Sequence, residues 1–273
     1  MPQLFDLTGK VAVVTGSTKG IGLGVARRFA EHGARVVISG RSQPDCERIA
    51  AEINRDAGRE AAIGQAGDLA DVASLQSLVT TAVDRFGGLD VLVMNAAKAD
   101  VQGRADQTST ADFQAMLNAN VVNNTALALA AHPHLQARGG GSVILISSIA
   151  ATGPSPTVAA YSVCKRALLQ LADNLAVEWG RQNIRVNVLA PGITVSDNTR
   201  PLWENPQLKA ALTADIPLGR FGEADDIAAA CVWLASPGGA FVTGQTIVVD
   251  GGSTMRGADK PPVDFKAAFD ASA

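Results

Sequence analysis

Short apolar runs alternate with longer segments of helical periodicity along most of this chain of 273 residues. Strands are expected at 11–15, 35–39, 61–65, 90–95, 142–147, 185–189 and 246–250, and helices at about 21–32, 43–57, 71–86, 108–137, 160–181 and 223–235. The strand runs are rich in β-branched residues and mostly apolar on both faces, which is typical of a parallel sheet covered on both sides. A helix that connects two parallel strands crosses over the sheet in a right-handed sense. The sequence therefore predicts an α/β fold with a doubly wound, seven-stranded parallel sheet and helices on both faces.

The chain shows no linker, internal repeat or low-complexity block, so we expect residues 1–273 to form a single domain. Residues 194–216 contain two prolines and little strand pattern, and are expected to form an insertion over the strand ends that contacts the substrate. The tail 257–273 is rich in Pro, Asp and Ala; we expect it to be mobile, the alternative being that it covers a neighbouring subunit.

The composition excludes several classes of function. A net charge of -3 gives no basic surface for nucleic acid, and no apolar run reaches the ~18 residues that span a bilayer. The three cysteines, Cys46, Cys164 and Cys231, lie far apart and predict neither a disulfide framework nor a metal site. Free thiols and an N-terminal sequence without signal-peptide features predict a cytoplasmic protein.

A glycine-rich turn follows the first expected strand and opens the first expected helix. At such a turn the backbone can approach a pyrophosphate closely, and the helix N-terminus offers unpaired N–H groups to the anion. An isolated glycine pattern would be read as a tight turn, but here strand, turn and helix occur together. The candidate dinucleotide-binding residues of this turn are Gly16, Thr18, Lys19, Gly20, Ile21 and Gly22.

The end of the second expected strand predicts which dinucleotide binds. A carboxylate there would accept the adenosine ribose hydroxyls and repel a 2′-phosphate, but residues 39–42 contain no acid. Arg41 and Lys19 fall where a 2′-phosphate would lie, and a guanidinium binds phosphate through paired N–H groups. We therefore expect NADP(H) rather than NAD(H), the alternative being that both are ordinary surface residues.

Two further strand ends carry candidate cofactor contacts. Asp68 could accept the adenine amino group, with the Leu69 backbone N–H beside it; the alternative is that Asp68 caps the next helix. Asn95 and Ala96 end the fourth strand and are expected to line the cofactor, the alternative being a plain strand-end turn.

A tyrosine and a lysine four residues apart form the candidate proton-transfer site. Tyr161 and Lys165 share one helix face, and the ammonium is expected to lower the tyrosine pKa from its usual value of about 10. Tyr161 could then exchange a proton with a carbonyl or alcohol, while Ser148 hydrogen-bonds the substrate oxygen. Lys165 is also expected to bind the nicotinamide ribose, and Asn120 to hold a water that relays protons to Lys165. Taken singly, Tyr161 and Lys165 could be a surface pair, Ser148 an ordinary serine at a strand end, and Asn120 one asparagine among several.

Together these residues resemble the short-chain dehydrogenase/reductase family, in its compact single-domain branch, from about residue 7 to residue 253. The matching motifs are the turn 15–22, Asn95 to Ala97, Asn120, Ser148 with Tyr161 and Lys165, and Pro191-Gly192. The resemblance implies a Rossmann-like fold, nicotinamide-dependent interconversion of a carbonyl and an alcohol, and often a tetramer.

The same resemblance places Pro191, Gly192, Ile193 and Thr194 against the cofactor. Ser196 occupies the place of a threonine that meets the carboxamide in the family, and either Thr194 or Ser196 could serve. Ala97 stands where the family has glycine, a change we expect to be tolerated.

We therefore predict an NADP(H)-dependent oxidoreductase that acts on a small ketone or secondary alcohol, and the family resemblance implies a homotetramer. The alternatives are an NAD-dependent alcohol dehydrogenase of the same family, a non-catalytic nucleotide-binding protein, and an epimerase or dehydratase of the same fold. The substrate pocket is expected between residues 97–102, 150–156 and 194–216. Trp203 is a candidate lid, the alternative being ordinary packing. Lys98 is a candidate contact for an anionic substrate, the alternative being a hydrated loop charge.

Overall fold

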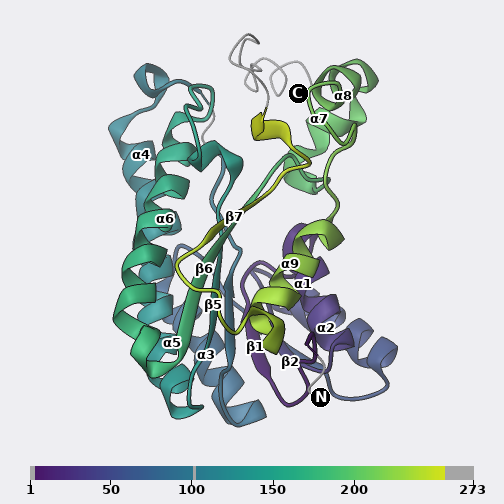
Figure 1. Cartoon of the computed structure of the whole chain (residues 1–273), viewed down its shortest axis with the longest axis vertical. Helices are drawn as coiled ribbons and strands as arrows, with labels where there is room; N and C mark the ends of the chain where they lie inside the picture. The colour runs from purple at the N-terminus through teal and green to yellow at the C-terminus, as the bar shows by residue number, and fades with distance from the viewer. Residues whose placement is uncertain (1–3, 101–102, 256–273) are drawn as a thin grey trace.

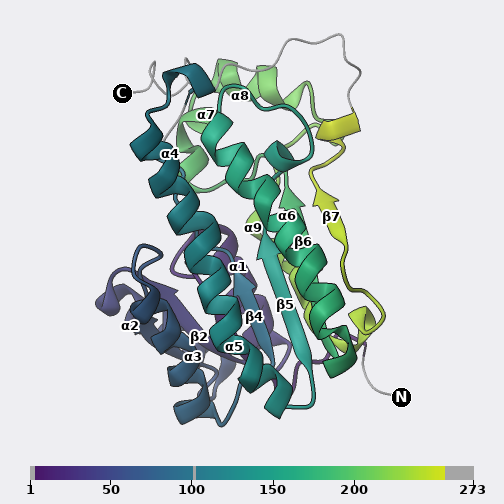
Figure 2. The same ribbon diagram turned by 90° about the vertical axis from the view of Figure 1, so that its left-hand side faces the viewer.

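The computed structural model describes residues 4–100 and 103–255, and within them a parallel sheet forms the centre of the molecule (Figures 1 and 2). Its strand order is β3-β2-β1-β4-β5-β6-β7. The strands are β1 (Val11–Val14), β2 (Arg35–Gly40), β3 (Ala62–Ala66), β4 (Val91–Met94), β5 (Gly141–Ile146), β6 (Ile184–Pro191) and β7 (Thr246–Val249). The chain runs outward from β1 to β3, returns to β4 beside β1, and runs outward again to β7. The predicted doubly wound, seven-stranded sheet is confirmed.

Helices cover both faces of the sheet, as Figure 1 shows. One face carries α1 (Gly20–Glu31), α2 (Gln43–Ala57) and α9 (Ala224–Ala235), and the other carries α3 (Val72–Phe86), α5 (Asn124–Ala137) and α6 (Ala159–Trp179). The remaining α-helices of the described residues are α4 (Thr110–Leu117), α7 (Arg200–Glu204) and α8 (Pro206–Thr213). The expected element boundaries are correct to within about two residues, except in the long helix 108–137 and at the end of β6.

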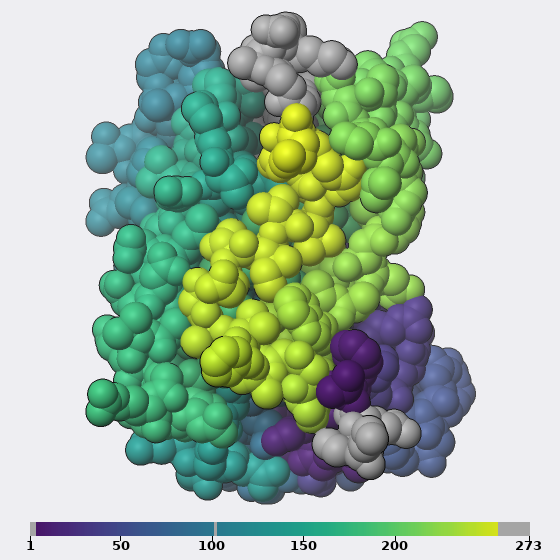
Figure 3. Space-filling view, viewed as in Figure 1, coloured from purple at the N-terminus to yellow at the C-terminus, as the bar shows by residue number. Residues whose placement is uncertain are grey.

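Alternate side chains of the central strands enter different halves of the core. On β1, Val11 and Val13 pack with α3, α5 and α6, whereas Ala12 and Val14 pack with α1, α2 and α9. This explains why the strand sequences are continuously apolar rather than alternating. Edge strand β7 is different, because Val248 is 40% exposed and β7 lies open on the face shown in Figure 3. The expectation that every strand is covered on both sides is therefore wrong for β7.

The long helix expected at 108–137 contains a π-helical segment, Asn118–Asn123, between α4 and α5. Asparagine side chains bond to the backbone one turn back: Asn120 Nδ2 donates to Met116 O at 3.0 Å, and Asn124 Nδ2 donates to Asn120 O at 2.9 Å. Side-chain bonds of this kind compete with the regular helical pattern, and π-helical segments frequently mark functional sites. The periodicity of the sequence did not predict this irregularity.

Residues 194–216 lie beyond the carboxyl ends of the strands, where α7 and α8 are seen in Figures 1 and 2. A small apolar cluster of Leu202, Leu212, Ile216 and Phe221 packs the segment against the chain that follows it. Among the helices of residues 4–100 and 103–255, none is long and apolar enough to cross a membrane. The tail 257–273 and residues 101–102 of the expected pocket wall lie outside the described residues.

Candidate functional site

The glycine turn between β1 and α1 requires glycine at three of its positions. Gly16 has a φ of +64° and Gly20 a φ of +56°, in the left-handed region that favours glycine. A Cβ atom added at Gly22 would lie 2.3 Å from Gly16 O and 2.6 Å from Asn95 Nδ2, closer than real contacts allow. The turn is therefore built for a close approach of backbone to backbone.

The start of α1 fits an anion. Its N-cap is Lys19, which is extended and makes no side-chain hydrogen bond to the first turn. The first N–H groups of a helix have no partner within the helix, and they carry the positive end of the helix dipole. Within a helix of 12 residues, this arrangement suits the pyrophosphate of a dinucleotide.

A pair of polar residues fixes the turn against the end of β4. Thr15 Oγ1 accepts hydrogen bonds from Asn95 N at 2.9 Å and Ala96 N at 3.0 Å. Asn95 Nδ2 donates to Thr15 O at 2.9 Å and Gly16 O at 3.1 Å. Both donors of the Asn95 amide are thus used by the turn, so Asn95 positions the site. This role of Thr15 was not predicted from the sequence.

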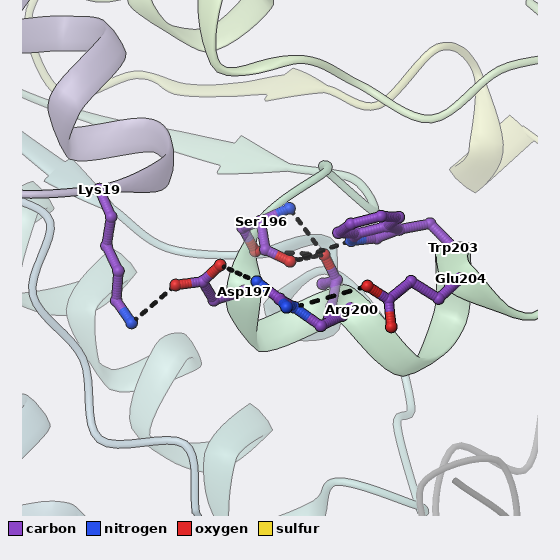
Figure 4. Close-up of polar contacts among 7 residues, drawn as sticks. Lys19, Ser196, Asp197, Arg200, Trp203 and Glu204 are labelled. Carbon is purple, nitrogen blue, oxygen red and sulfur yellow. Dashed lines mark hydrogen bonds and ion pairs between the residues drawn. The ribbon is translucent and has the colours of Figure 1, made fainter.

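The tip of β2 lies against the same turn. A Cβ added at Gly40 would meet Thr18 Cγ2 and Oγ1 at 2.9 Å, so Thr18 packs directly on Gly40. Arg41 follows and is exposed; it makes no ion pair with any residue that the structure describes. Lys19, by contrast, lies 3.0 Å from Asp197 Oδ2 through its Nζ (Figure 4). Both predicted phosphate contacts are on the surface beside the turn, but only Arg41 is unpaired.

The loop after β3 is tied to the π-helical segment. Asp68 is exposed, and its Oδ1 accepts a hydrogen bond from Ala70 N at 2.9 Å. The N-cap of α3 is Asp71, so the alternative interpretation of Asp68 as that cap is wrong. Asn123 Nδ2 donates to Leu69 O at 2.8 Å, a contact that the sequence did not predict.

Ser148, Tyr161 and Lys165 come together where β5 ends and α6 begins. Ser148 caps the short 3₁₀ helix after β5, with its Oγ accepting from Ala150 N at 3.1 Å, and its side chain hydrogen-bonds Tyr161. Lys165 Nζ lies 5.5 Å from the centre of the Tyr161 ring, one turn along α6. The i, i+4 spacing therefore places the phenol and the amine side by side, as the sequence predicted.

Burial dominates the protonation of this pair. It raises the pKa of Tyr161 to about 12, against the smaller lowering effect of the Ser148 hydrogen bond. It also lowers the pKa of Lys165 to about 8. The expectation that Lys165 lowers the tyrosine pKa is not met in this structure, because loss of hydration disfavours both charged forms. Lys165 Nζ donates to Ile146 O at 2.7 Å, which leaves two of its three N–H groups for other partners.

Asn120 is buried in the π-helical segment, and both N–H donors of its side-chain amide are used. Its Oδ1 accepts from Lys98 N at 3.0 Å, and its Nδ2 donates to Lys98 O at 2.9 Å as well as to Met116 O. A relay water of the kind expected would therefore bind the Asn120 carbonyl oxygen, which accepts one hydrogen bond from Asn124. The Asn120 amide itself fixes the loop after β4.

The chain after β6 lies close to the glycine turn. Gly192 N donates to Val249 O at 2.9 Å, and Ile193 O accepts from Gly222 N at 2.9 Å, which orders the segment that follows Pro191. Thr194 is buried and its hydroxyl donates to Gly192 O at 3.1 Å. Ser196 is half-buried, and its Cβ lies 3.5 Å from a Cβ built at Gly20. Of the two hydroxyls considered for the carboxamide, Ser196 lies beside the turn.

The lid and anion-contact candidates have partners in the protein. Trp203 Nε1 donates to Ser196 O at 3.0 Å, and its ring packs on the apolar cluster of the segment 194–216. Lys98 Nζ lies 2.5 Å from Asp100 Oδ2. Cys164 is buried, and burial raises the pKa of its thiol, which makes it a poor nucleophile.

Comparisons with known proteins agree with this fold. A family model described as enoyl-(acyl carrier protein) reductase matches residues 16–254. Dehydrogenase/reductase SDR family member 4 from Bos taurus is 39% identical, over 93% of this chain and 90% of that protein. A crystal structure of a gluconate 5-dehydrogenase from Burkholderia cenocepacia in complex with NADP and tartrate superimposes with a TM-score of 0.86 and 34% identity, covering 93% of this chain and 98% of that chain.

A second solved structure, a 7α-hydroxysteroid dehydrogenase complexed with NADH and a 7-oxo bile acid conjugate, has a TM-score of 0.86 and 31% identity, over 91% of this chain and 96% of that chain. The fold and these similarities define a nicotinamide-dependent oxidoreductase. The chain belongs to the short-chain dehydrogenase/reductase family.

The ionisation of Tyr161 can be measured directly, because it is the single tyrosine of the chain. At pH 10, where an ordinary tyrosine is half ionised, we expect almost no tyrosinate absorbance from the folded protein and about half of the full signal in denaturant. Because the folded state keeps this proton up to a pKa of about 12, the free energy of unfolding should fall as the pH rises above about 10. The Tyr161→Phe variant supplies the blank, and half ionisation in the folded protein at pH 10 would contradict the account.

Proposed function

We propose that this protein is an NADP(H)-dependent oxidoreductase that interconverts a carbonyl and a secondary alcohol, with Tyr161 as general acid and base. The observation that carries the proposal is the Ser148–Tyr161 hydrogen bond with the Lys165 amine beside it. When bound, the nicotinamide supplies or accepts the hydride. In the reductive direction the Tyr161 hydroxyl gives its proton to the substrate oxygen, and Ser148 donates a hydrogen bond to the same oxygen as negative charge develops.

Lys165 restores the proton to Tyr161 in this proposal. A buried amine with a pKa of about 8 exchanges protons readily near neutral pH, and two of its N–H groups are not used by Ile146 O. One of these suits the nicotinamide ribose, and the other suits a water on the Asn120 carbonyl oxygen. Asn120 and Asn95 act on the reaction through the backbone segments that they hold.

We assign the remaining cofactor contacts to residues around the turn. The turn 16–22 and the start of α1 would hold the pyrophosphate, because the glycines allow a close approach and the N–H groups are uncapped. Asp68 and the Leu69 N–H would hold the adenine, and the segment 191–194, with Ser196, would hold the carboxamide end. Arg41 and Lys19 would hold a 2′-phosphate, since residues 39–42 contain no carboxylate to repel it.

One observation favours NAD(H) as a second candidate cofactor. The Lys19 ammonium is paired with Asp197, so part of the positive charge beside the turn is already balanced. The relatives do not decide the matter, because one solved structure is described with NADP and another with NADH. Unpaired Arg41 is the reason that NADP(H) remains our proposal.

We further propose a cytoplasmic location, supported by three free, buried cysteines, and a homotetramer. Two separate exposed apolar areas support the assembly: Val122, Leu129, Val163 and Val177 on the long helices, and Phe241 and Val248 around β7. Large apolar side chains gathered on a surface are typical of subunit contacts.

Removal of the Tyr161 hydroxyl tests the mechanism. We expect Tyr161→Phe to lower kcat for ketone reduction by roughly a hundred- to ten-thousand-fold, the contribution of a general acid, with cofactor affinity nearly unchanged. Ser162→Ala is the matched control, because its hydroxyl bonds to Ala159 O on the same helix turn and should be dispensable. Substantial turnover by Tyr161→Phe across a panel of ketones and sugar acids would contradict the assigned role.

Reversal of charge at Arg41 tests the cofactor assignment. Arg41→Asp should lower the kcat/KM ratio for NADPH over NADH by roughly ten- to a hundred-fold, since it replaces a phosphate donor with a ribose-hydroxyl acceptor. Arg48→Asp, an exposed arginine on α2, gives the matched charge change away from the β2 tip. Equal ratios in the two variants would show that Arg41 is a surface residue without a cofactor role.

The mass of the protein in solution, measured by light scattering at several concentrations, tests the assembly. We expect a tetramer, and we expect Phe241→Asp to convert it to a smaller species because a charge would be buried at the β7 contact. A wild-type monomer would contradict this part of the proposal.

A further inference from the structure

The Lys19–Asp197 pair joins two parts of the site that serve different ligands. Lys19 belongs to the glycine turn, whereas Asp197 begins a short 3₁₀ helix in the segment 194–216. The other oxygen of Asp197, Oδ1, accepts a hydrogen bond from Arg200 Nη2 at 2.9 Å, and Arg200 Nε lies 3.8 Å from Glu204 Oε1 (Figure 4). One carboxylate is thus shared between a cation of the turn and a cation of its own segment.

The position of Asp197 is fixed by more than this ion pair. Ser196 and Thr199 hydrogen-bond to each other, and Thr199 Oγ1 donates to Thr194 O at 2.6 Å. Trp203 holds Ser196 O from the other side, so the backbone around Asp197 is anchored to the apolar cluster of the segment. The carboxylate is therefore presented to the turn whether or not Lys19 is bound to it.

The two partners of Lys19 would compete. A 2′-phosphate beside Arg41 and the Asp197 carboxylate are both anions. The Lys19 ammonium therefore has to leave the carboxylate in order to bind the phosphate at full strength. Lys19 is 65% exposed and on a flexible stem, so it can exchange, whereas Asp197 keeps Arg200 after the exchange. An ordinary surface ion pair would have no such consequence and would contribute little.

We propose that Asp197 is a specificity-determining residue, which weakens the preference for a 2′-phosphorylated dinucleotide by withholding Lys19. The inference rests on the proposed function, since it assumes that a 2′-phosphate lies beside Lys19 and Arg41. NADPH binding includes the loss of the Lys19–Asp197 pair, and NADH binding leaves the pair intact. The chain therefore carries a built-in restraint on its own cofactor selectivity.

Calorimetric titration of NADPH and NADH into five forms of the full chain tests this inference. The forms are wild type, Asp197→Asn, Glu204→Gln, Lys19→Gln and the double variant that combines Lys19→Gln and Asp197→Asn. Lys19→Gln alone is the reference for the double variant. Glu204→Gln is the matched control, because it removes an acid that pairs with Arg200 and does not contact Lys19. Circular dichroism melts of each form show that the variants are folded.

We expect Asp197→Asn to bind NADPH about two- to five-fold more tightly than wild type, the effect of releasing one exposed ion pair, with NADH affinity unchanged. Glu204→Gln should match wild type, and Asp197→Asn should have no effect when Lys19 is already Gln. Two results would overturn the inference. One is equal NADPH affinity of Asp197→Asn and Glu204→Gln, and the other is a gain in NADPH affinity from Asp197→Asn that persists when Lys19 is Gln. A wild-type preference for NADH would instead overturn the proposed cofactor, and a gain for NADPH in Asp197→Asn would then still support the role of Asp197.

Discussion

The close packing of the glycine turn against the end of β4 is the constraint on which the rest of the site depends. Gly22 leaves room for the Gly16 carbonyl and the Asn95 amide, and Asn95 then bonds to both Thr15 O and Gly16 O. This contact fixes the position of the first turn of α1, whose N–H groups would bind an anion. It also fixes the loop after β4, which Asn120 holds from the other side through Lys98.

Burial sets the chemistry at the other half of the site. The same desolvation that keeps Tyr161 protonated brings the Lys165 amine close to neutral pH, so the proton lies on the phenol in the resting protein. A protonated phenol held by Ser148 is ready to act as an acid toward a carbonyl. The activation of Tyr161 as a base therefore requires a change in its surroundings, and is not built into the Tyr161–Lys165 spacing alone.

Much of the fold and site could be predicted because the strongest local signals act independently of distant packing. The apolar runs gave the strands, and the i, i+4 spacing placed Tyr161 beside Lys165. The exposure of β7 could not be predicted, because an edge strand has an apolar sequence much like that of a central one. The π-helical segment was also missed, although its three asparagines, poor residues for a regular helix, were a signal that could have been used. The Lys19–Asp197 pair joins residues 178 positions apart, and no sequence pattern reports such a contact.

The measurement that tests the central claim most directly is a calorimetric comparison of NADPH and NADH binding to the unmodified protein. We predict that both dinucleotides bind and that NADPH binds more tightly, because Arg41 and Lys19 would bind a 2′-phosphate and residues 39–42 offer no carboxylate. Tighter binding of NADH would contradict the cofactor assignment while leaving the Ser148–Tyr161–Lys165 site in place. Binding of neither would contradict the assignment of the glycine turn as a dinucleotide site.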